Sequence, residues 1–119
     1  MASRILIVDD HAGFRASARR LAEAAGLEVA GEAADAASGL AAARTLRPDV
    51  VLLDVQLPDA SGFAVAEALA RDGAGPRVIL VSSRDRDDLG PLVDTCGAHG
   101  FIAKARLTRE ALTRLLDPA

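Results

Sequence analysis

The stretch Ile5-Leu6-Ile7-Val8-Asp9-Asp10 decides how this chain folds. Four consecutive apolar residues, three of them β-branched, predict a strand buried on both faces, as strands in a parallel sheet are. Two aspartates end the run and place carboxylates at the carboxyl end of this strand. Strand signals of the same kind recur at residues 27–30, 49–53, 77–81 and 100–103, and the first of these is the weakest.

Between the strand signals, apolar residues recur at helical spacing. Phe14, Ala18, Leu21 and Ala25 fall on one helical face, and Gly26 supplies a stop. Four further helices are indicated. The second would start at Asp35 or Ser38 and end before Pro48, and the third would be capped by Ser61, with Phe63, Ala66 and Leu69 facing inward. The fourth shows a stripe of Leu89, Leu92, Val93 and Cys96, and the fifth would be capped by Thr108, with Leu112, Leu115 and Leu116 buried. Strand and helix thus alternate five times. We therefore expect an α/β protein with a (βα)5 doubly wound, five-stranded parallel sheet, a flavodoxin-like three-layer sandwich.

The size and charge of the chain limit what it can do. With 119 residues the chain has the length of one domain, and residues 1–119 are expected to form a single one. The formal net charge of −3 argues against a nucleic-acid surface, which needs a basic stripe. The single cysteine, Cys96, permits no internal disulfide and is expected to be buried. Because no apolar run approaches the ~18 residues that span a bilayer, we expect no membrane insertion and a cytoplasmic location.

Polar side chains follow four of the five predicted strands. Asp9 and Asp10 follow the first, Asp54 the third, Ser82 the fourth and Lys104 the last. Parallel strands share one carboxyl edge, so these groups are expected to meet on one rim of the sheet. Three neighbouring carboxylates repel one another unless a cation lies among them. Oxygen ligands of this kind favour Mg²⁺ over Zn²⁺.

This combination of groups suits phosphoryl transfer. An aspartate carboxylate can attack phosphorus to form an aspartyl phosphate. Lys104 would neutralise a phosphate oxygen and the Ser82 hydroxyl would donate to another, so that catalysis is mostly positioning and charge stabilisation. Taken singly, each residue is more often a turn residue, a helix cap or a solvated charge. Their joint placement at strand ends is what indicates a site.

Three sequence motifs carry a resemblance to a known family. Residues 5–10 (ILIVDD), 50–62 (VVLLDVQLPDASG) and 100–104 (GFIAK) match the first strand with its acidic pair, the acceptor strand with the loop after it, and the last strand with its lysine. The chain resembles bacterial response-regulator receiver domains over essentially its whole length. The DDH start, residues 29–36 (VAGEAADA) and GFIAK are most similar to the subfamily that usually carries a LuxR-type helix-turn-helix output.

The resemblance implies a role for each residue on the rim. Asp54 would be the phosphorylated residue. Mg²⁺ would be held by Asp9, Asp10 and Asp54 together with the backbone carbonyl of Gln56. Lys104 would pair with the phosphoryl group. The chain is then not a conventional enzyme, although it catalyses its own Mg²⁺-dependent phosphotransfer and autodephosphorylation.

The resemblance also implies a conformational switch and its partners. Ser82 would move toward the phosphoryl group, and Phe101 would rotate inward behind it. The phosphodonor would be a sensor histidine kinase or a phosphotransfer protein of a two-component system, and the output would be transcription regulation. DNA would be bound only through an output domain that residues 1–119 do not include. Homodimer formation on phosphorylation is left open.

Some residues depart from the family pattern or from regular helix signals. Ala105 follows Lys104 where many receivers have proline, and Ser83 stands where alanine or glycine is common. Gly90-Pro91 weakens the fourth helical segment, which we expect to start late or to be mobile across residues 84–95. His11 follows the acidic pair, but oxygens already supply the site, so we do not expect it to bind the metal.

Three other readings of the acidic motif remain as alternatives. A hydrolase of the haloacid dehalogenase type needs a second aspartate two residues after the nucleophile, where this chain has Gln56. A flavodoxin-like nucleotide or flavin module needs a phosphate loop after the first strand, where Asp9 and Asp10 would repel phosphate. A degenerate receiver usually lacks an acidic residue or the lysine, and this chain retains the full set.

Overall fold

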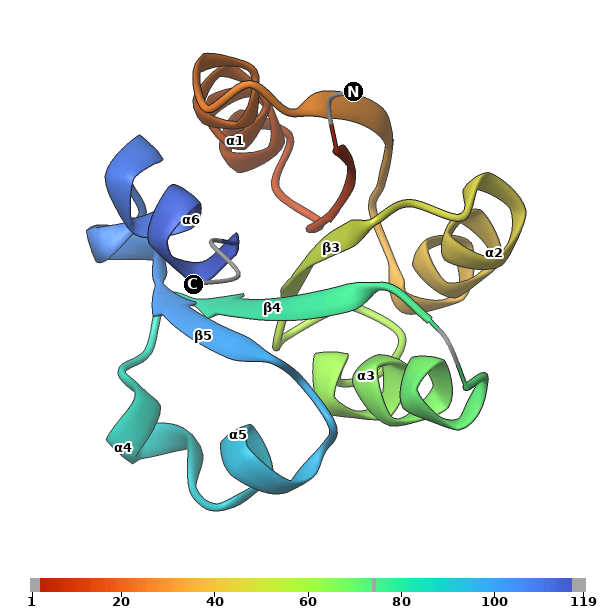
Figure 1. The fold of residues 1–119 in the computed structure, drawn as a ribbon. Helices are drawn as coiled ribbons and strands as arrows, with labels where there is room; N and C mark the ends of the chain where they lie inside the picture. The colour runs from red at the N-terminus through yellow and green to blue at the C-terminus, as the bar shows by residue number, and fades with distance from the viewer. Residues whose placement is uncertain (1–2, 74, 117–119) are drawn as a thin grey trace.

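All five strands of the computed structural model run parallel in a single sheet (Figure 1), and the structure describes residues 3–73 and 75–116. The strands are β1 (Arg4–Val8), β2 (Glu28–Ala33), β3 (Val50–Asp54), β4 (Arg77–Ser82) and β5 (Gly100–Ala103). Their order is β2-β1-β3-β4-β5, so the chain moves outward from β1 to β2 and then returns past β1 to β3. The strand order therefore reverses beside β1 and β3, which is where ligands bind in open parallel sheets. The predicted fold class is confirmed.

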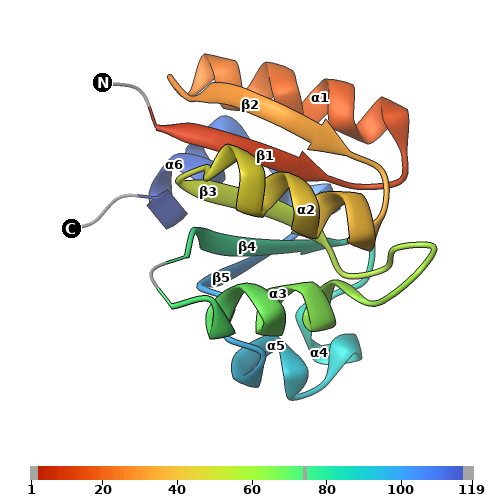
Figure 2. The same ribbon diagram turned by 90° about the vertical axis from the view of Figure 1, so that its right-hand side faces the viewer.

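Two layers of helix cover the sheet. The helices are α1 (Ala12–Ala24), α2 (Ala36–Leu46), α3 (Gly62–Arg71), α4 (Arg86–Leu89), α5 (Leu92–Thr95) and α6 (Arg109–Leu116), with a 3₁₀ turn, η1 (Lys104–Arg106). Buried residues of α1 and α6 pack on one face of the sheet, and those of α2, α3 and α5 pack on the other (Figures 1 and 2). No helix within residues 3–73 and 75–116 is long and apolar enough to cross a membrane.

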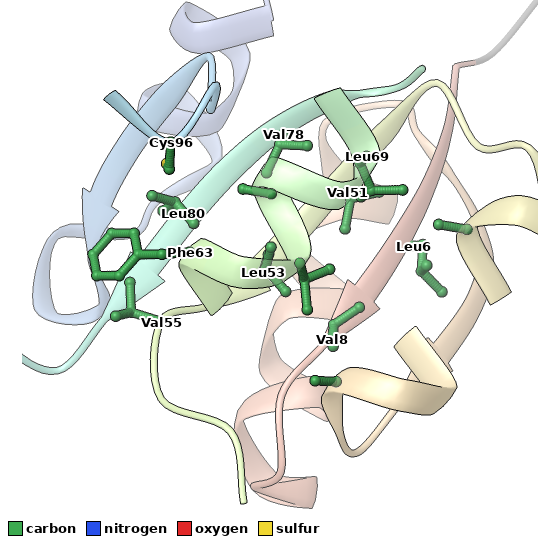
Figure 3. Close-up of a cluster of buried hydrophobic side chains, with 14 of the residues drawn as sticks. Leu6, Val8, Val51, Leu53, Val55, Phe63, Leu69, Val78, Leu80 and Cys96 are labelled. Atoms are coloured by element: carbon green, nitrogen blue, oxygen red, sulfur yellow. The ribbon is translucent and has the colours of Figure 1, made fainter. Parts of the chain in front are cut away.

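Alternation along the strands builds two hydrophobic cores. Leu6 and Val8 of β1 face α2 and α3, whereas Ile5 and Ile7 face α1 and α6. The same alternation continues along β3 and β4, and Figure 3 shows the first core with its β3 and β4 side chains beneath α3. Cys96 lies in this core, only 2% exposed, as expected from the sequence. Because both faces of β1, β3 and β4 are buried, these strands are nearly continuous apolar runs, whereas the edge strand β2 is partly exposed and contains Glu28 and Glu32.

The predicted helix starts are confirmed by side-chain caps. Asp35 accepts a hydrogen bond from the Ser38 backbone N–H at 2.8 Å, which makes Asp35 the cap of α2. Ser61 accepts one from Ala64 at 3.2 Å at the start of α3. The hydroxyl of Thr108 accepts one from the Ala111 backbone at 3.0 Å at the start of α6. Each cap satisfies a backbone donor that the helix itself leaves without a partner.

The loop between β3 and α3 is fastened to α2 by a contact that the sequence did not suggest. Asp59 accepts hydrogen bonds from the backbone N–H groups of Ala36 at 2.7 Å and Ala37 at 3.0 Å. These two donors hold the pKa of the Asp59 carboxyl below its usual range. A carboxylate at a helix N-terminus is also favoured by the helix dipole. The loop that follows the acceptor strand is therefore anchored to a neighbouring helix.

The fourth helical segment differs from its predicted stripe. It forms two short turns, α4 and α5, which are separated at Gly90, where φ is +79°. Val93 and Cys96 are buried as expected, but the prediction that Leu92 faces inward is wrong, because its side chain is 45% exposed. Gly90 and Pro91 interrupt the helix, so the residues after them no longer continue the face that begins at Leu89. The segment is thus broken at Gly90-Pro91 and does not start late as a whole, because α4 already begins at Arg86, while its mobility stays a prediction.

Close packing at the start of α3 requires glycine. A Cβ atom built on Gly62 would lie 2.1 Å from the carbonyl oxygen of Asp54 and 2.9 Å from the Cα of Val55. These neighbours are backbone atoms of the acceptor strand and its loop, so they cannot move aside as a flexible side chain can. Gly62 thus allows α3 to begin against the end of β3.

Replacing Gly62 with alanine should destabilise the protein strongly. We expect Gly62→Ala to lower the free energy of unfolding by more than ~2 kcal/mol, because overpacking against backbone forces the strand end or the helix to shift. Gly13→Ala is the matched control, since a Cβ there meets nothing within 4 Å and the position is helical. This control should leave stability unchanged or raise it by up to ~1 kcal/mol. Urea denaturation measures both, and equal effects would contradict the packing argument.

The two turns of the fourth segment should open more readily than the intact helices. We expect amide hydrogens of residues 86–96 to exchange much faster than those of α3, because α4 has no buried residue and each turn is only four residues long. Hydrogen exchange followed by NMR or mass spectrometry measures this. Protection in residues 86–96 equal to that of α3 would show that the break at Gly90 has no dynamic consequence.

Candidate functional site

The carboxyl edge of the sheet brings together the acidic residues that the sequence singled out. One potential ligand atom each from Asp9, Asp10, His11 and Asp54 lie within 4.8 Å of one another. Asp9 is completely buried and Asp54 is 4% exposed, whereas Asp10 is open to solvent. The expected meeting of the first and third strands at this rim is therefore present. Lys104, which follows β5, forms ion pairs with Asp9 and Asp54.

Asp9 is held mainly through one of its two oxygens. Its Oδ1 accepts a hydrogen bond from the His11 backbone N–H at 2.8 Å. Its Oδ2 is buried and accepts no hydrogen bond from the described residues. The ammonium nitrogen of Lys104 lies 2.7 Å from this Oδ2, so the two form an ion pair that lacks the alignment of a hydrogen bond. Within the described chain, this buried oxygen is therefore compensated by the charge of Lys104 and not by an aligned hydrogen bond.

Asp54 occupies the last position of β3, one residue beyond the predicted end of that strand. Its Oδ1 accepts a hydrogen bond from the Gln56 backbone N–H at 3.2 Å, and its Oδ2 lies 3.5 Å from the Lys104 nitrogen. Burial, and next the negative charge of Asp9, raise the pKa of Asp54, while the Gln56 N–H and Lys104 oppose this change. The ionised carboxylate therefore stands in surroundings that favour an additional cation.

The donor set fits a divalent cation that prefers oxygen ligands. Three carboxylates stand within reach of one another, and among the described residues Lys104 pairs with two of them, Asp9 and Asp54. The buried Oδ2 of Asp9 is ion-paired with Lys104 but accepts no aligned hydrogen bond in the described chain, which fits a place for a cation. Mg²⁺ binds such carboxylates and retains waters. His11 was not expected to be a ligand, and its Nδ1 lies 3.2 Å from Asp9 and 3.1 Å from Asp10.

Helix α1 supports the site through residues that the sequence analysis did not single out. Arg15 donates to the backbone carbonyl of Asp9 at 2.6 Å and to Glu32 at 3.1 Å. Arg19, one turn further, donates to the other oxygen of Glu32 at 2.9 Å. The i, i+4 spacing of the two arginines indicates a shared face, but their common partner on β2 becomes visible only in the fold. Phe14, predicted only as part of an apolar stripe, places its ring 4.3 Å from the Lys104 nitrogen.

The residues expected to act as a switch lie at the neighbouring strand ends. Ser82 is 1% exposed, and its hydroxyl accepts a hydrogen bond from the Arg84 backbone N–H at 3.0 Å. Phe101 is partly buried against the core that faces α3. The chain after Lys104 continues into the turn η1, with no cis peptide bond in the described residues. The movement of Ser82 and Phe101, and the role of the Gln56 carbonyl, stay predictions.

Comparison with known proteins agrees with this geometry. The family model for the response regulator receiver domain matches residues 5–117. The nitrate/nitrite response regulator protein NarP of Escherichia coli (strain K12) is 39% identical over 103 residues, which are 85% of this chain and 47% of NarP. The chain spans about half the length of the curated regulators it matches, 53% of one and 48% of another.

Solved structures give the same result. The signal receiver domain of the response regulator NarL from Mycobacterium tuberculosis is 33% identical, with a TM-score of 0.86 over 97% of this chain and 93% of that one. A two-component response regulator of the LuxR family from Aurantimonas sp. SI85-9A1 is 28% identical, with a TM-score of 0.85 over 96% of this chain and 81% of that one. Together with the acidic group at the carboxyl edge of the sheet, these matches show that the chain belongs to the response regulator receiver domain family.

Proposed function

We propose that this domain is a phosphorylation-activated switch whose acceptor is Asp54. The observation that carries the proposal is the position of the Asp54 carboxylate, which lies beside Asp9 and Asp10 with its Oδ2 3.5 Å from the only lysine. A carboxylate oxygen of Asp54 attacks the phosphorus of a phosphohistidine on a sensor histidine kinase or phosphotransfer protein. The bond between phosphorus and the imidazole nitrogen breaks, and its electron pair stays on that nitrogen.

The residues around Asp54 stabilise the charge that this transfer brings. Asp9, Asp10, Asp54 and the Gln56 carbonyl would hold Mg²⁺, which supplies positive charge for the phosphoryl oxygens. The Lys104 ammonium offers a second positive charge that is fixed before the reaction begins. Later attack of water on the aspartyl phosphate releases inorganic phosphate and restores the carboxylate. The phosphoryl group is carried on the protein itself, so the domain acts as a switch with its own catalytic groups.

The signal leaves the site through the ends of β4 and β5. The Ser82 hydroxyl accepts a hydrogen bond from the Arg84 N–H, so its own O–H is free to donate to a phosphoryl oxygen on Asp54 when the side chain turns toward it. Phe101 lies on the adjacent strand, where Ser82 pairs with Ala103, so a shift at Ser82 is transmitted along β5. We propose that the output is transcription regulation through an attached DNA-binding domain, because the chain covers about half of regulators such as NarP. Cytoplasmic location and homodimer formation stay predictions.

Removing the charge of Asp54 should stabilise the metal-free protein. The pKa of Asp54 is raised by burial, so its ionised form at neutral pH opposes folding, and that opposition disappears when the group is neutral. We expect Asp54→Asn to raise the free energy of unfolding in EDTA by ~1–2 kcal/mol. The exposed acid Asp87, changed to asparagine, is the control and should have little effect.

Addition of Mg²⁺ should make the wild-type protein more stable than Asp54→Asn, the reverse of the order expected in EDTA. The ion binds the folded state of the wild-type protein, so its melting temperature rises with Mg²⁺ concentration, by the equivalent of about 2.7 kcal/mol at 100 times the dissociation constant. Asp54→Asn should respond much less, while Asp87→Asn should respond like the wild type. Scanning calorimetry at matched ionic strength measures these shifts. A response equal in all three proteins would show that Asp54 is not a ligand.

Phosphorylation should be confined to Asp54 and depend on Mg²⁺. After incubation with acetyl phosphate and Mg²⁺, intact-mass spectrometry is expected to show a gain of one phosphoryl group on the wild type and on Asp87→Asn. Asp54→Asn, and wild type in EDTA, should show none. A gain that persists in Asp54→Asn would move the acceptor elsewhere. No gain on a folded, Mg²⁺-binding wild-type protein, with acetyl phosphate or with a purified histidine kinase, would refute the switch.

A further inference from the structure

The ammonium of Lys104 rests against an aromatic ring as well as against carboxylates. Its nitrogen lies 4.3 Å from the centroid of the Phe14 ring. This is inside the ~6 Å range over which the face of an aromatic ring attracts a cation. Lys104 is the only lysine in the chain, and its side chain is 18% exposed. The contact therefore joins one particular aromatic residue to the one ammonium side chain of the protein, at the edge where the acids gather.

Phe14 differs from an ordinary core phenylalanine in its surroundings. It is only partly buried and packs at the edge of the core between the sheet, α1 and α6. Phe63, by comparison, is 8% exposed and lies inside the opposite core, where Figure 3 shows it beside Leu80 and Val55. Phe14 also follows the acidic pair by only four residues. The ring is thus carried by the first turn of the helix that begins at the site.

The backbone that carries the ring is fixed to the same site. Arg15, the next residue, donates to the carbonyl of Asp9 at 2.6 Å and to Glu32 of β2 at 3.1 Å. These bonds tie the first turn of α1 to the end of β1 and to the neighbouring strand. Because the helix cannot shift freely relative to Asp9, the Phe14 ring and the Asp9 carboxylate keep a defined separation. The Lys104 ammonium contacts both groups, the ring at 4.3 Å and the Asp9 Oδ2 at 2.7 Å.

The ring supplies something that the carboxylates do not. The ammonium lies 2.7 Å from Asp9 Oδ2, yet that oxygen accepts no properly aligned hydrogen bond from the described residues. Directional hydrogen bonding to Asp9 therefore does not fix its position. An aromatic face attracts the cation through its quadrupole and carries no net charge. The ammonium can be held there while its full positive charge remains available to a phosphoryl group.

We propose that Phe14 is a positioning residue that holds the Lys104 ammonium, through a cation–π contact, in place for phosphoryl transfer to Asp54. The kinetic part of this inference rests on the proposed function. The contact itself exists in the unphosphorylated protein and can be tested without a phosphodonor. Failure of the two ideas can therefore be told apart.

The contact is tested by weakening the ring face without changing the shape of the side chain. Phe14 is replaced site-specifically by 4-fluoro-, 3,5-difluoro- and 3,4,5-trifluorophenylalanine, which reduce the negative potential of the face in steps. The same three residues at Phe63 are the matched control. With ¹³C-labelled lysine the protein gives signals from Lys104 alone, since the chain has no other lysine. In the wild type, the side-chain methylene nearest the ammonium should be shifted upfield by the ring, and Phe14→Leu should remove that shift.

The expected result is a graded response at one position only. Fluorination at Phe14 should move the Lys104 signals stepwise toward those of free lysine and slow phosphorylation by acetyl phosphate roughly two- to tenfold by the trifluoro residue. Phe14→Tyr should keep both properties, and fluorination at Phe63 should leave both unchanged. Lys104 signals that ignore fluorination at Phe14 would overturn the contact. Signals that move while the phosphorylation rate stays constant would overturn the positioning role. If the wild type is not phosphorylated at all, the proposed function fails, and the Lys104 signals still decide whether the ring holds the ammonium.

Discussion

Burial of two carboxylates at the carboxyl edge of the sheet is the constraint on which the rest of the structure depends. Asp9 is wholly buried and Asp54 is 4% exposed, and the nearest opposite charge is a single ammonium, that of Lys104. An ionised carboxylate out of water is costly unless charge and hydrogen bonds compensate it. A hydrophobic pair at these positions would serve stability better. Groups kept at such a cost are typical of a functional site, where the uncompensated negative charge favours binding of a cation.

The parallel sheet places the Asp9 and Asp54 carboxylates side by side at its carboxyl edge, and close backbone contacts keep the neighbouring loops in place. Strand order reverses beside β1 and β3, so Asp9 and Asp54 end two neighbouring strands. Gly62 lets α3 start directly against the carbonyl of Asp54, with no room for a side chain. Asp59 fastens the loop between them to the first amides of α2. Arg15 does the same for the loop after β1 through the carbonyl of Asp9. These three supports act through backbone atoms at the site, while the Asp9 and Asp54 carboxylates are contacted by nearby amides, by the His11 ring and by Lys104 in the described chain.

Sequence patterns predicted what depends on local order and missed what depends on tertiary distance. The apolar runs of β1, β3 and β4 predicted their strands clearly, because strands buried on both faces carry few polar residues, whereas the edge strand β2 contains Glu28 and Glu32 and gave the weakest signal. The caps at Asp35 and Ser61 were predictable because a capping side chain binds amides only a few residues away. Asp59 contacts amides 23 and 22 residues earlier in the chain, and no local pattern signals such a bond. Gly90-Pro91 predicted a weak helix, but the exposure of Leu92 follows only from how the two turns are oriented on the core.

The two halves of the site differ in how firmly they are held, and a switch needs this difference. On the β1 side, Arg15 links α1 to both Asp9 and β2, and Phe14 meets Lys104 from the same helix. On the β4 side, the Ser82 hydroxyl is bonded only to an amide of its own loop in the described chain, and the segment beyond it is broken at Gly90 into turns without side-chain caps. We therefore expect the second half to rearrange at lower cost than the first, which would direct structural change on phosphorylation toward β4, α4 and β5.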